Sequence, residues 1–242
     1  MDIVKGTSKT YKLKSFLIEG VEKSGKTSFL ATLPKPILVF DAERSSESRL
    51  AGVKDIDFIE CYDKQGEQPG AGYRRFSKNL KELMSMKEIP YKSICLDPLS
   101  FISDSIVSEL DQTNPGMKGS SNTFAFWGKN KDRHIEIVDQ ILTLPCIVGI
   151  TSHVRLLEDE TTGAKSFLPD INGSFRDSVG GKVDAVLFTK VTPQGQKAKY
   201  TVQVVPNAQK KAGMRVPLGM ENKIGLELPA DYQEIMKLVN NK

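Results

Sequence analysis

The sequence predicts an α/β fold in which a mainly parallel β-sheet is covered by helices on both faces. Short apolar runs, typical of buried strands, alternate along the chain with segments whose apolar residues recur at helical spacing. Strands buried on both faces of a parallel sheet read as nearly continuous apolar runs, as they do here. The expected strands are residues 15–19, 36–41, 56–60, 92–97, 146–152, 183–191 and 200–205.

Helices are expected between these strands and at the end of the chain. The last two strands break the alternation, because only the turn Pro193-Gln194-Gly195 separates them, so an antiparallel extension at the sheet edge is predicted. Three segments without periodicity are expected to be loops, which in compact α/β domains are often functional or mobile when they are long. The expected helices are 26–33, 73–86, 101–110, 127–144 and 231–239, and the expected loops are 63–72, 113–123 and 156–181.

Length and composition favour one packed domain. The 242 residues are divided into a basic N-terminal segment (1–14), a core (15–215) and a C-terminal segment with a helix (216–242). Hydrophobic residues make up 39% and charged residues 26%, a balance that supports a packed core and excludes wholesale disorder. No apolar run approaches the ~18 residues of a membrane span, and the N-terminus is too polar for a signal peptide, so no membrane partner is expected. The three cysteines are far apart and are interpreted as reduced core residues of a cytoplasmic protein.

Positive charge is unevenly distributed, although the net charge is only +4. Clustered cations favour a polyanionic partner, and the alternative is a set of solvated surface side chains. The clusters are the N-terminal Lys5, Lys9, Lys12 and Lys14, the helical Arg74, Arg75, Lys78 and Lys81, and the C-terminal Lys210, Lys211 and Arg215.

The stretch GVEKSGKT at residues 20–27 matches the phosphate-binding loop pattern G-x-x-x-x-G-K-[ST] at every fixed position. An expected strand leads into it and an expected helix leads out, which is the context the pattern requires. Glycines let backbone N–H groups turn toward a phosphate, and the helix N-terminus adds its positive dipole end. Lys26 is expected to reach the terminal phosphates of ATP, and Thr27 to ligate Mg²⁺. The expected nucleotide-binding residues are Gly20, Val21, Glu22, Lys23, Ser24, Gly25, Lys26, Thr27 and Ser28.

Two acidic residues at strand ends are candidates for the chemistry. Asp97 ends an apolar strand and is expected to hold the water shell of Mg²⁺; alternatively, it caps a helix that begins near Pro98. No glutamate follows Asp97 directly, so the residue that activates water must come from elsewhere. Glu43 lies just beyond the end of the second strand, where α/β sheets place their ligands. The alternative is that Glu43 is a surface loop acid.

The FDAE stretch at residues 40–43, followed by a polar turn, resembles RecA-type recombinase ATPases. In that family the glutamate equivalent to Glu43 polarises the attacking water. In RecA-like cores, the strand at 146–152 would lie between the phosphate-loop strand and the strand of Asp97. A polar residue at its tip senses the γ-phosphate, so this role is expected for His153, with Ser152 as the alternative. His134 lies on an expected helix and is interpreted as structural.

The segment after that strand resembles the small phage RecA/Rad-like ATPases, a group that includes Sak-type single-strand annealing recombinases. The similarity is carried by PDING at residues 169–173 and VDAVL at 183–187, and extends over residues 15–215. The resemblance implies a RecA-like P-loop NTPase core and a Mg²⁺-dependent ATPase that binds single-stranded DNA in phage recombination. It also implies a homo-oligomer, a phage-encoded protein in the bacterial cytoplasm, and a single-strand-binding protein as a further partner.

The segment PNAQKKAGMRVP, residues 206–217, follows the last expected strand and carries Lys210, Lys211 and Arg215. In RecA-type sites a basic residue from the neighbouring subunit completes the site, because the developing charge is half exposed in one protomer. We expect Lys211 or Arg215 to act in this way, or these cations to contact DNA; the alternative is a solvated hairpin tip. Two other functions remain open: a P-loop kinase of a small metabolite, and a non-catalytic scaffold or loader of a phage replication complex.

Overall fold

A computed structural model describes residues 12–118, 123–220 and 224–240, so Lys5 and Lys9 of the basic N-terminal cluster lie outside the described residues. The strands are β1 (Ser15–Glu19), β2 (Ile37–Asp41), β3 (Ile56–Glu60), β4 (Ser93–Asp97), β5 (Ile147–Ser152), β6 (Val154–Glu158), β7 (Lys165–Pro169), β8 (Ala185–Gln194), β9 (Lys197–Gln203), β10 (Gly213–Met214) and β11 (Glu227–Pro229). The helices are α1 (Lys26–Leu30), α2 (Ser46–Arg49), α3 (Ala71–Ser85), α4 (Leu99–Thr113), α5 (Thr123–Leu142) and α6 (Tyr232–Asn240), with 3₁₀ turns η1 (Ser174–Asp177) and η2 (Val179–Lys182).

One large sheet organises the molecule. Its strands follow the order β11-β9-β8-β1-β5-β4-β2-β3, and β10 pairs with β8. The pairs from β8 through β1, β5, β4 and β2 to β3 are parallel, whereas β9, β10 and β11 pair antiparallel. The predicted α/β class, the antiparallel extension and the position of β5 between β1 and β4 are therefore confirmed. Because the parallel strands run the same way, their carboxyl ends meet at one edge of the sheet.

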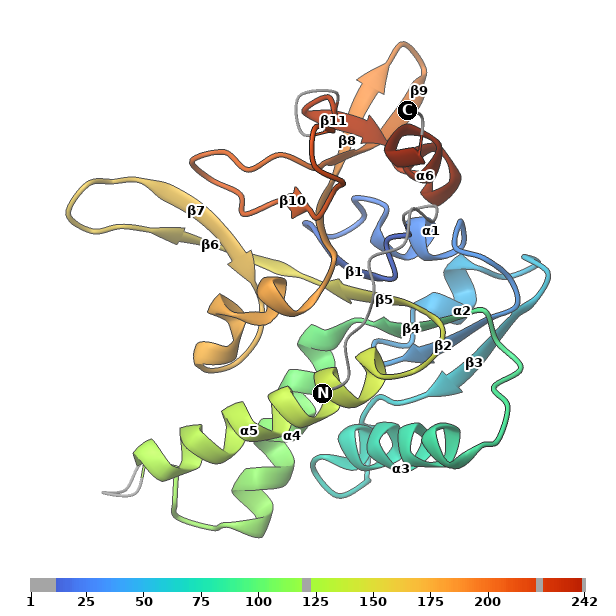
Figure 1. Cartoon of the computed structure of the whole chain (residues 1–242). Helices are drawn as coiled ribbons and strands as arrows, with labels where there is room; N and C mark the ends of the chain where they lie inside the picture. The colour runs from blue at the N-terminus through green and yellow to red at the C-terminus, as the bar shows by residue number, and fades with distance from the viewer. Residues whose placement is uncertain (1–11, 119–122, 221–223, 241–242) are drawn as a thin grey trace, which may run out of the picture.

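Helices cover both faces of this sheet (Figure 1). Alternate residues of β1 divide between two hydrophobic clusters, with Leu17 in one and Phe16 and Ile18 in the other. The first cluster packs the sheet against α3, α4 and α5, and the second packs it against α1 and α6. This division follows from the twofold alternation of side chains along a strand. The chain therefore has an apolar layer on each face, which holds the strand ends in fixed positions.

The predicted loop at 156–181 is wrong. The segment contains the end of β6, all of β7, η1 and nearly all of η2, and the β6–β7 hairpin projects to one side of the molecule (Figure 1). Its register pairs Val154 with Pro169 and Glu158 with Lys165. β6 and β7 lie outside the large sheet, with one isolated bridge between Phe167 and Lys210, and Leu156 is 51% exposed. Burial therefore imposes little of the apolar alternation by which strands are found in a sequence.

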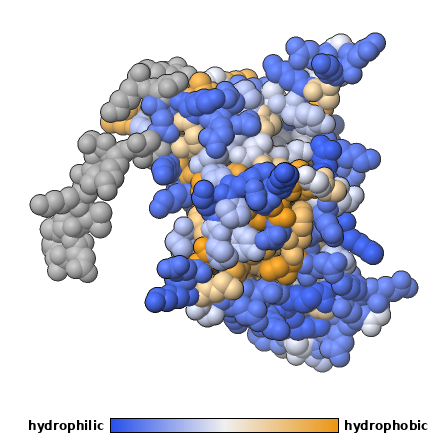
Figure 2. Space-filling view, turned by 90° about the vertical axis from the view of Figure 1, so that its right-hand side faces the viewer, coloured by the Kyte–Doolittle hydropathy of each residue, from blue (hydrophilic) through white to orange (hydrophobic). Residues whose placement is uncertain are grey.

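The boundaries of several elements differ from those predicted. The helix expected at 26–33 ends at Leu30, and α4 and α5 each begin before the expected positions 101 and 127. α2, β10 and β11 were not predicted, because elements of two to four residues carry too little periodicity. The face of the molecule seen in Figure 2 is mostly hydrophilic, with a small apolar area near its middle. Among the described residues, no helix has the length and apolarity needed to cross a membrane.

Two structural interpretations of single residues agree with the fold. Cys61, Cys95 and Cys146 are buried and unpaired, as expected for reduced core residues. His134 is fully buried, and its ring nitrogens lie 2.7 Å from the Asn130 carbonyl oxygen and 2.8 Å from Ser103 Oγ. Burial lowers the pKa of His134 to about 4, so this side chain is a neutral structural group at neutral pH.

Candidate functional site

The segment from Gly20 to Thr27 forms a closed loop between β1 and α1. Gly25 has φ 100°, a left-handed conformation that glycine adopts without steric cost. Gly20 is required for space, because a Cβ placed there would lie 2.1 Å from Thr189 Oγ1 and 2.5 Å from Ser24 Oγ. Those two hydroxyls are 2.6 Å apart and tie the loop to β8. Neighbouring strands thus hold the loop in its wrapped shape.

Lys26 lies inside this loop. Its side-chain amine donates hydrogen bonds to the carbonyl oxygens of Gly20 at 3.0 Å and Val21 at 2.8 Å. Burial lowers the pKa of Lys26 from its ordinary value, while the carboxylates of Asp97 and Glu43 act in the opposite direction. The amine is therefore a buried donor held at the centre of a concave loop, the arrangement that suits a phosphate oxygen.

Asp97 ends β4 and is 2% exposed. Hydroxyl groups from three other elements donate to its carboxylate: Thr27 and Ser46 to Oδ2, each at 2.8 Å, and Thr151 to Oδ1. Burial is the main influence on Asp97 and raises its pKa, and the three hydroxyl donors partly offset the increase. A buried carboxylate beside a threonine hydroxyl supplies the hard oxygen ligands that Mg²⁺ prefers. The alternative role of Asp97 as a helix cap has no support, since Pro98 is the N-cap residue of α4 and no side chain of the described residues caps it.

Glu43 and His153 face each other across the ends of β2 and β5. Glu43 Oε2 lies 3.2 Å from His153 Nε2, and the two side chains are 32% and 16% exposed. The hydrogen bond with His153 is the largest influence on Glu43 and lowers its pKa. Glu43 is therefore ionised at neutral pH and is an acceptor that can orient a water molecule. Asp41 has a structural role instead, because its Oδ1 accepts the backbone N–H groups of Glu43 and Arg44 at 3.2 and 2.9 Å.

These groups open into one cavity with a volume of about 410 Å³. The loop and the start of α1 line one part of the cavity, and the carboxyl ends of β2, β4 and β5 contribute the acidic and histidine side chains. Among the predicted residues, the cavity brings together Glu22, Lys23, Gly25, Lys26, Thr27, Ser28, Glu43, Asp97 and His153. Ser152, the alternative sensor, is fully buried and hydrogen-bonds through Oγ to the His153 carbonyl oxygen, so it does not line the cavity.

A sequence model of one protein family, AAA_24, described as an AAA domain, matches residues 12–216. The chain belongs to this AAA domain family. Family membership supports a nucleotide-binding P-loop ATPase, in agreement with the loop geometry.

Other comparisons add little. No curated protein sequence matches the chain. Among solved structures, a KaiC-like protein from the hyperthermophilic archaeon Pyrococcus horikoshii OT3 is similar over 83% of this chain and 82% of its own chain, with 12% sequence identity and a TM-score of 0.44.

Sequence reasoning missed two residues that line the site of this AAA domain protein. Tyr200 on β9 packs its ring against the phosphate loop, since a Cβ on Gly25 would lie 2.7 Å from its Cδ1. Arg49 at the end of α2 donates from Nε and Nη2 to Ser28 Oγ at 3.1 and 2.9 Å. Neither belongs to a recognisable motif, and each is brought to the cavity only by tertiary packing.

The C-terminal cations of the AAA domain do not line the phosphate-loop cavity. Lys210 lies over the ring of Phe188, with its amine 4.1 Å from the ring centroid. Arg215 donates to the Gly181 carbonyl oxygen at 2.8 Å, and Arg215 and Lys211 line a different cavity next to Glu19. Within one protomer, the fold therefore places the segment 206–217 beside η1 and η2.

The residues of the phosphate-loop cavity fit a nucleoside triphosphate with a divalent cation. The Lys26 amine is held by two backbone carbonyls, which are weaker partners than phosphate oxygens for a charged donor. The hydroxyl of Thr27 and the carboxylate of Asp97 are already in contact, so a cation or its water shell would meet both. Lys26, Thr27 and Asp97 would hold the triphosphate and Mg²⁺, and Glu43 lies across the cavity from them.

Proposed function

We propose that this AAA domain protein is a Mg²⁺-dependent ATPase of the RecA type that binds single-stranded DNA in phage recombination or annealing. The observation that carries the ATPase part is the convergence of Lys26, the Thr27–Asp97 pair and Glu43 on one cavity. The DNA part is supported by the resemblance of the PDING and VDAVL segments to phage RecA/Rad-like ATPases, and by the basic side chains near the C-terminus.

Each residue has a role that its surroundings support. Bound Mg²⁺ neutralises charge on the terminal phosphates and on the leaving group. Lys26 would exchange its backbone carbonyl partners for phosphate oxygens, and Asp97 with Thr27 would hold the cation. Glu43 orients the attacking water; its lowered pKa makes it a weak base, so positioning of the water is its main contribution. His153 detects the γ-phosphate through its hydrogen bond with Glu43.

We further propose that the active form is a homo-oligomer in the cytoplasm of a bacterial host, in contact with a single-strand-binding protein. Lys211 or Arg215 either approaches the ATP of a neighbouring protomer or contacts DNA. The pairing of β10 with β8 holds the segment that carries them on the surface. From there, Lys211 or Arg215 can reach either a neighbouring protomer or DNA.

One observation favours the alternative of phosphoryl transfer to a small molecule. A second cavity of about 630 Å³ lies on the far side of Glu43, with Tyr62, Phe101 and Asp104 among its walls. Glu43 lines both cavities, so an acceptor hydroxyl in the second could meet the same carboxylate that would orient water. The non-catalytic scaffold remains the third candidate.

The deciding experiment measures phosphate release from ATP by the purified protein, alone, with single-stranded DNA, and with a panel of small-molecule acceptors. Hydrolysis stimulated by DNA supports the proposal, and phosphorylation of an acceptor supports the kinase. Lys26→Ala is the control for contaminating activity, and its turnover should be abolished because it lacks the buried amine. ATP binding without turnover in any arm supports the scaffold and contradicts the proposal.

A further inference from the structure

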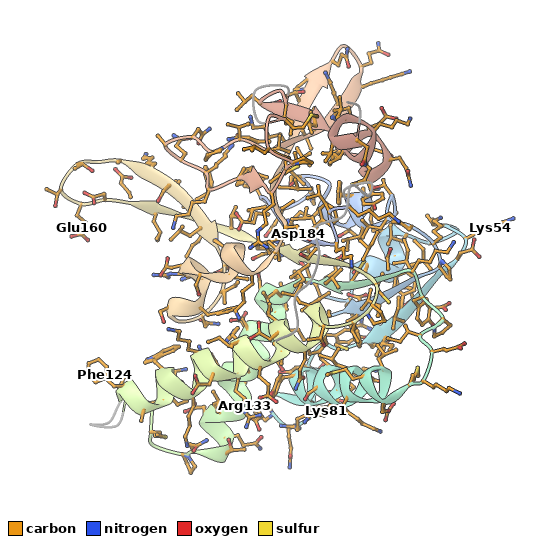
Figure 3. All side chains as sticks on the ribbon, viewed as in Figure 1. Lys54, Lys81, Phe124, Arg133, Glu160 and Asp184 are labelled. Carbon is orange, nitrogen blue, oxygen red and sulfur yellow. The ribbon has the colours of Figure 1, made fainter. Side chains whose placement is uncertain are left out.

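A separate cavity lies behind the phosphate loop, on the β8 side of β1. It has a volume of about 410 Å³ and is bounded by η1, η2 and the segment that leads into β10. Its charged walls are Glu19, Arg176, Asp177, Asp184, Lys211 and Arg215. Asp184 marks its position near the centre of the molecule in Figure 3. Glu19 is the last residue of β1 and directly precedes Gly20 of the phosphate loop.

The cations of this cavity come from segments that are far apart in the sequence. Arg176 belongs to η1, whereas Lys211 lies just before β10. Two contacts bring the segments together: β10 pairs with the start of β8, and Lys210 forms a bridge with Phe167 of β7. The fold therefore brings Arg176 next to the C-terminal basic cluster, a proximity that the sequence did not predict.

Two of these cations have unused donors. Arg176 Nε is buried without a hydrogen-bond partner in the described part of the chain, and its ion-pair contact with Asp177 Oδ1 is 4.0 Å long. Lys211 forms no ion pair or hydrogen bond with any residue in the described ranges. Asp184, by contrast, is engaged by the backbone N–H groups of Lys14 and Ser15 and by Arg215. The cavity thus contains one buried donor without an acceptor, Arg176 Nε, and the exposed amine of Lys211, which no carboxylate among the described residues neutralises.

Glu19 contributes a buried carboxyl group to the same cavity. Its side chain is 4% exposed, and its carboxylate accepts no hydrogen bond from the residues that the structure describes. Burial raises the pKa of Glu19 to about 7, against the opposing influence of Lys211. A carboxyl group that keeps its proton near neutral pH is a hydrogen-bond donor. With Glu19 protonated, three cations in the cavity face two carboxylates, and one of these two already pairs with Arg215.

We propose that this cavity binds a phosphodiester group of single-stranded nucleic acid, held by Arg176, Lys211 and the carboxyl group of Glu19. The proposal rests on the proposed function, for which it supplies the site. The anion satisfies the buried Arg176 Nε, forms an ion pair with Lys211, and accepts the proton of Glu19 in a hydrogen bond. No covalent step is involved. When the strand binds to protein in which Glu19 is ionised, Glu19 takes up one proton.

The site is connected to the ATP cavity through very few atoms. The Glu19 carbonyl oxygen accepts a hydrogen bond from Thr189 Oγ1 at 3.0 Å, and the same hydroxyl contacts Ser24 of the phosphate loop. The next residue, Gly20, accepts from the Lys26 amine. A phosphate that forms a hydrogen bond with Glu19 therefore acts on the backbone that positions Lys26. This connection would couple strand binding to ATP hydrolysis.

The basic cluster on α3 offers a matched control, because its cations are already used within the protein. Arg74 donates to the carbonyls of Gln68 and Pro69, and Arg75 pairs with Glu67 at 2.8 Å. Lys78 is a highly exposed lysine with a 3.9 Å contact to Glu82, and it lies outside both cavities. Lys78→Ala changes the net charge as Lys211→Ala does, without touching the proposed site.

The experiment follows fluorescence anisotropy of a labelled single-stranded oligothymidylate, with Mg²⁺ and a non-hydrolysable ATP analogue, across a salt series. Because both cations hold one phosphate, the double variant Arg176→Ala/Lys211→Ala should reduce the steepness of log affinity against log salt by about 0.7, the value for one neutralised phosphate on a single strand. Each single variant should reduce it by a smaller amount. Lys78→Ala should leave the slope unchanged, and thermal melts verify folding. An unchanged slope in the double variant, with wild-type binding intact, would overturn this site and leave the proposed function standing.

Glu19 is tested by pH and by proton uptake. The pKa of Glu19 is raised above its ordinary value, and a bound anion favours the protonated form of Glu19. The affinity of the wild-type protein for the strand should therefore be highest below about pH 7 and should fall as the pH rises above it. Calorimetry in two buffers of different ionisation enthalpy should detect proton uptake at about pH 8. Glu19→Gln, which keeps a donor but does not titrate, should bind without proton uptake; unchanged uptake in this variant would overturn the role of Glu19.

Two further outcomes identify the ligand. ATP hydrolysis by a wild-type protein that binds no strand at low salt would overturn the DNA part of the proposed function together with this site. Tripolyphosphate is the free-anion probe, used with Lys26→Ala to remove the phosphate loop. Two results together would overturn the assignment of the ligand as nucleic acid and make it a free polyanion. Tripolyphosphate would bind to the Lys26→Ala protein and lose this binding when Arg176→Ala is added, and the oligonucleotide would not displace it.

Discussion

Replacing Glu43 by Gln separates nucleotide binding from chemistry in this site. The amide keeps the size of the side chain and can still contact His153, but it lacks the charge that orients a water molecule. Mutating a group that positions or deprotonates the nucleophile typically costs 10²–10⁴-fold, which corresponds to about 3–5 kcal/mol in the transition state. We expect kcat to fall by at least about a hundredfold, with the Kd for ATP within a few-fold of wild type.

The structure bounds the side effects of this substitution. The Glu43–His153 contact joins side chains that are 32% and 16% exposed, so solvent screening limits its contribution to stability to about 1 kcal/mol or less. The loss of a negative charge near Lys26 is a second concern, because Glu43 and Glu22 both influence that amine. Glu22→Gln makes the same change in charge from another wall of the cavity, and it should leave kcat nearly unchanged.

Phosphate-release kinetics under saturating ATP, with ATP affinity from calorimetry, test the prediction. The pH profile adds an independent check: the pKa of Glu43 is lowered, so the carboxylate remains ionised and active as the pH falls from neutral to its ordinary value of 4.5. Any loss of activity on acidification at a pH above that value must come from the protonation of another group. If Glu43→Gln hydrolyses ATP as Glu22→Gln does, Glu43 does not orient the water and the RecA-type arrangement is wrong.

Three further substitutions test other parts of the site. Asp97→Asn should raise the melting temperature of the ligand-free protein, because burial raises the pKa of Asp97 and makes its ionised form unfavourable at neutral pH. This gain in melting temperature should vanish below about pH 4, where Asp97 is protonated in both the folded and the unfolded state. Mg²⁺-ATP should no longer stabilise the variant. Tyr200→Ala should weaken ATP binding by about 1–3 kcal/mol if the ring stacks on the base, whereas tripolyphosphate affinity stays constant; equal losses would refute stacking. Mixing Arg215→Ala with Lys26→Ala protein should restore part of the activity if Arg215 acts across an interface, and no recovery in co-assembled mixtures contradicts that arrangement.

The sequence alone determined the groups whose chemistry depends on local spacing. The phosphate loop is contiguous, and its glycines, Lys26 and Thr27 are defined by their distances along the chain. Asp97 and Glu43 were found because parallel strands end at one edge of a sheet, so residues after separate apolar runs become neighbours. The order of β1, β5 and β4 followed from the resemblance to RecA-like cores and agrees with the structure.

Only the tertiary structure decided which other side chains complete the cavities. Tyr200 and Arg49 reach the ATP cavity, and Glu19 meets Arg176 and Lys211, through contacts between segments that have no sequence relationship. The β6–β7 hairpin was missed because β6 has no fully buried residue and β7 is buried only at its end, so neither strand shows a clear periodic signal. Periodicity records which residues a segment buries, whereas a cavity depends on which surfaces the packed segments leave facing one another.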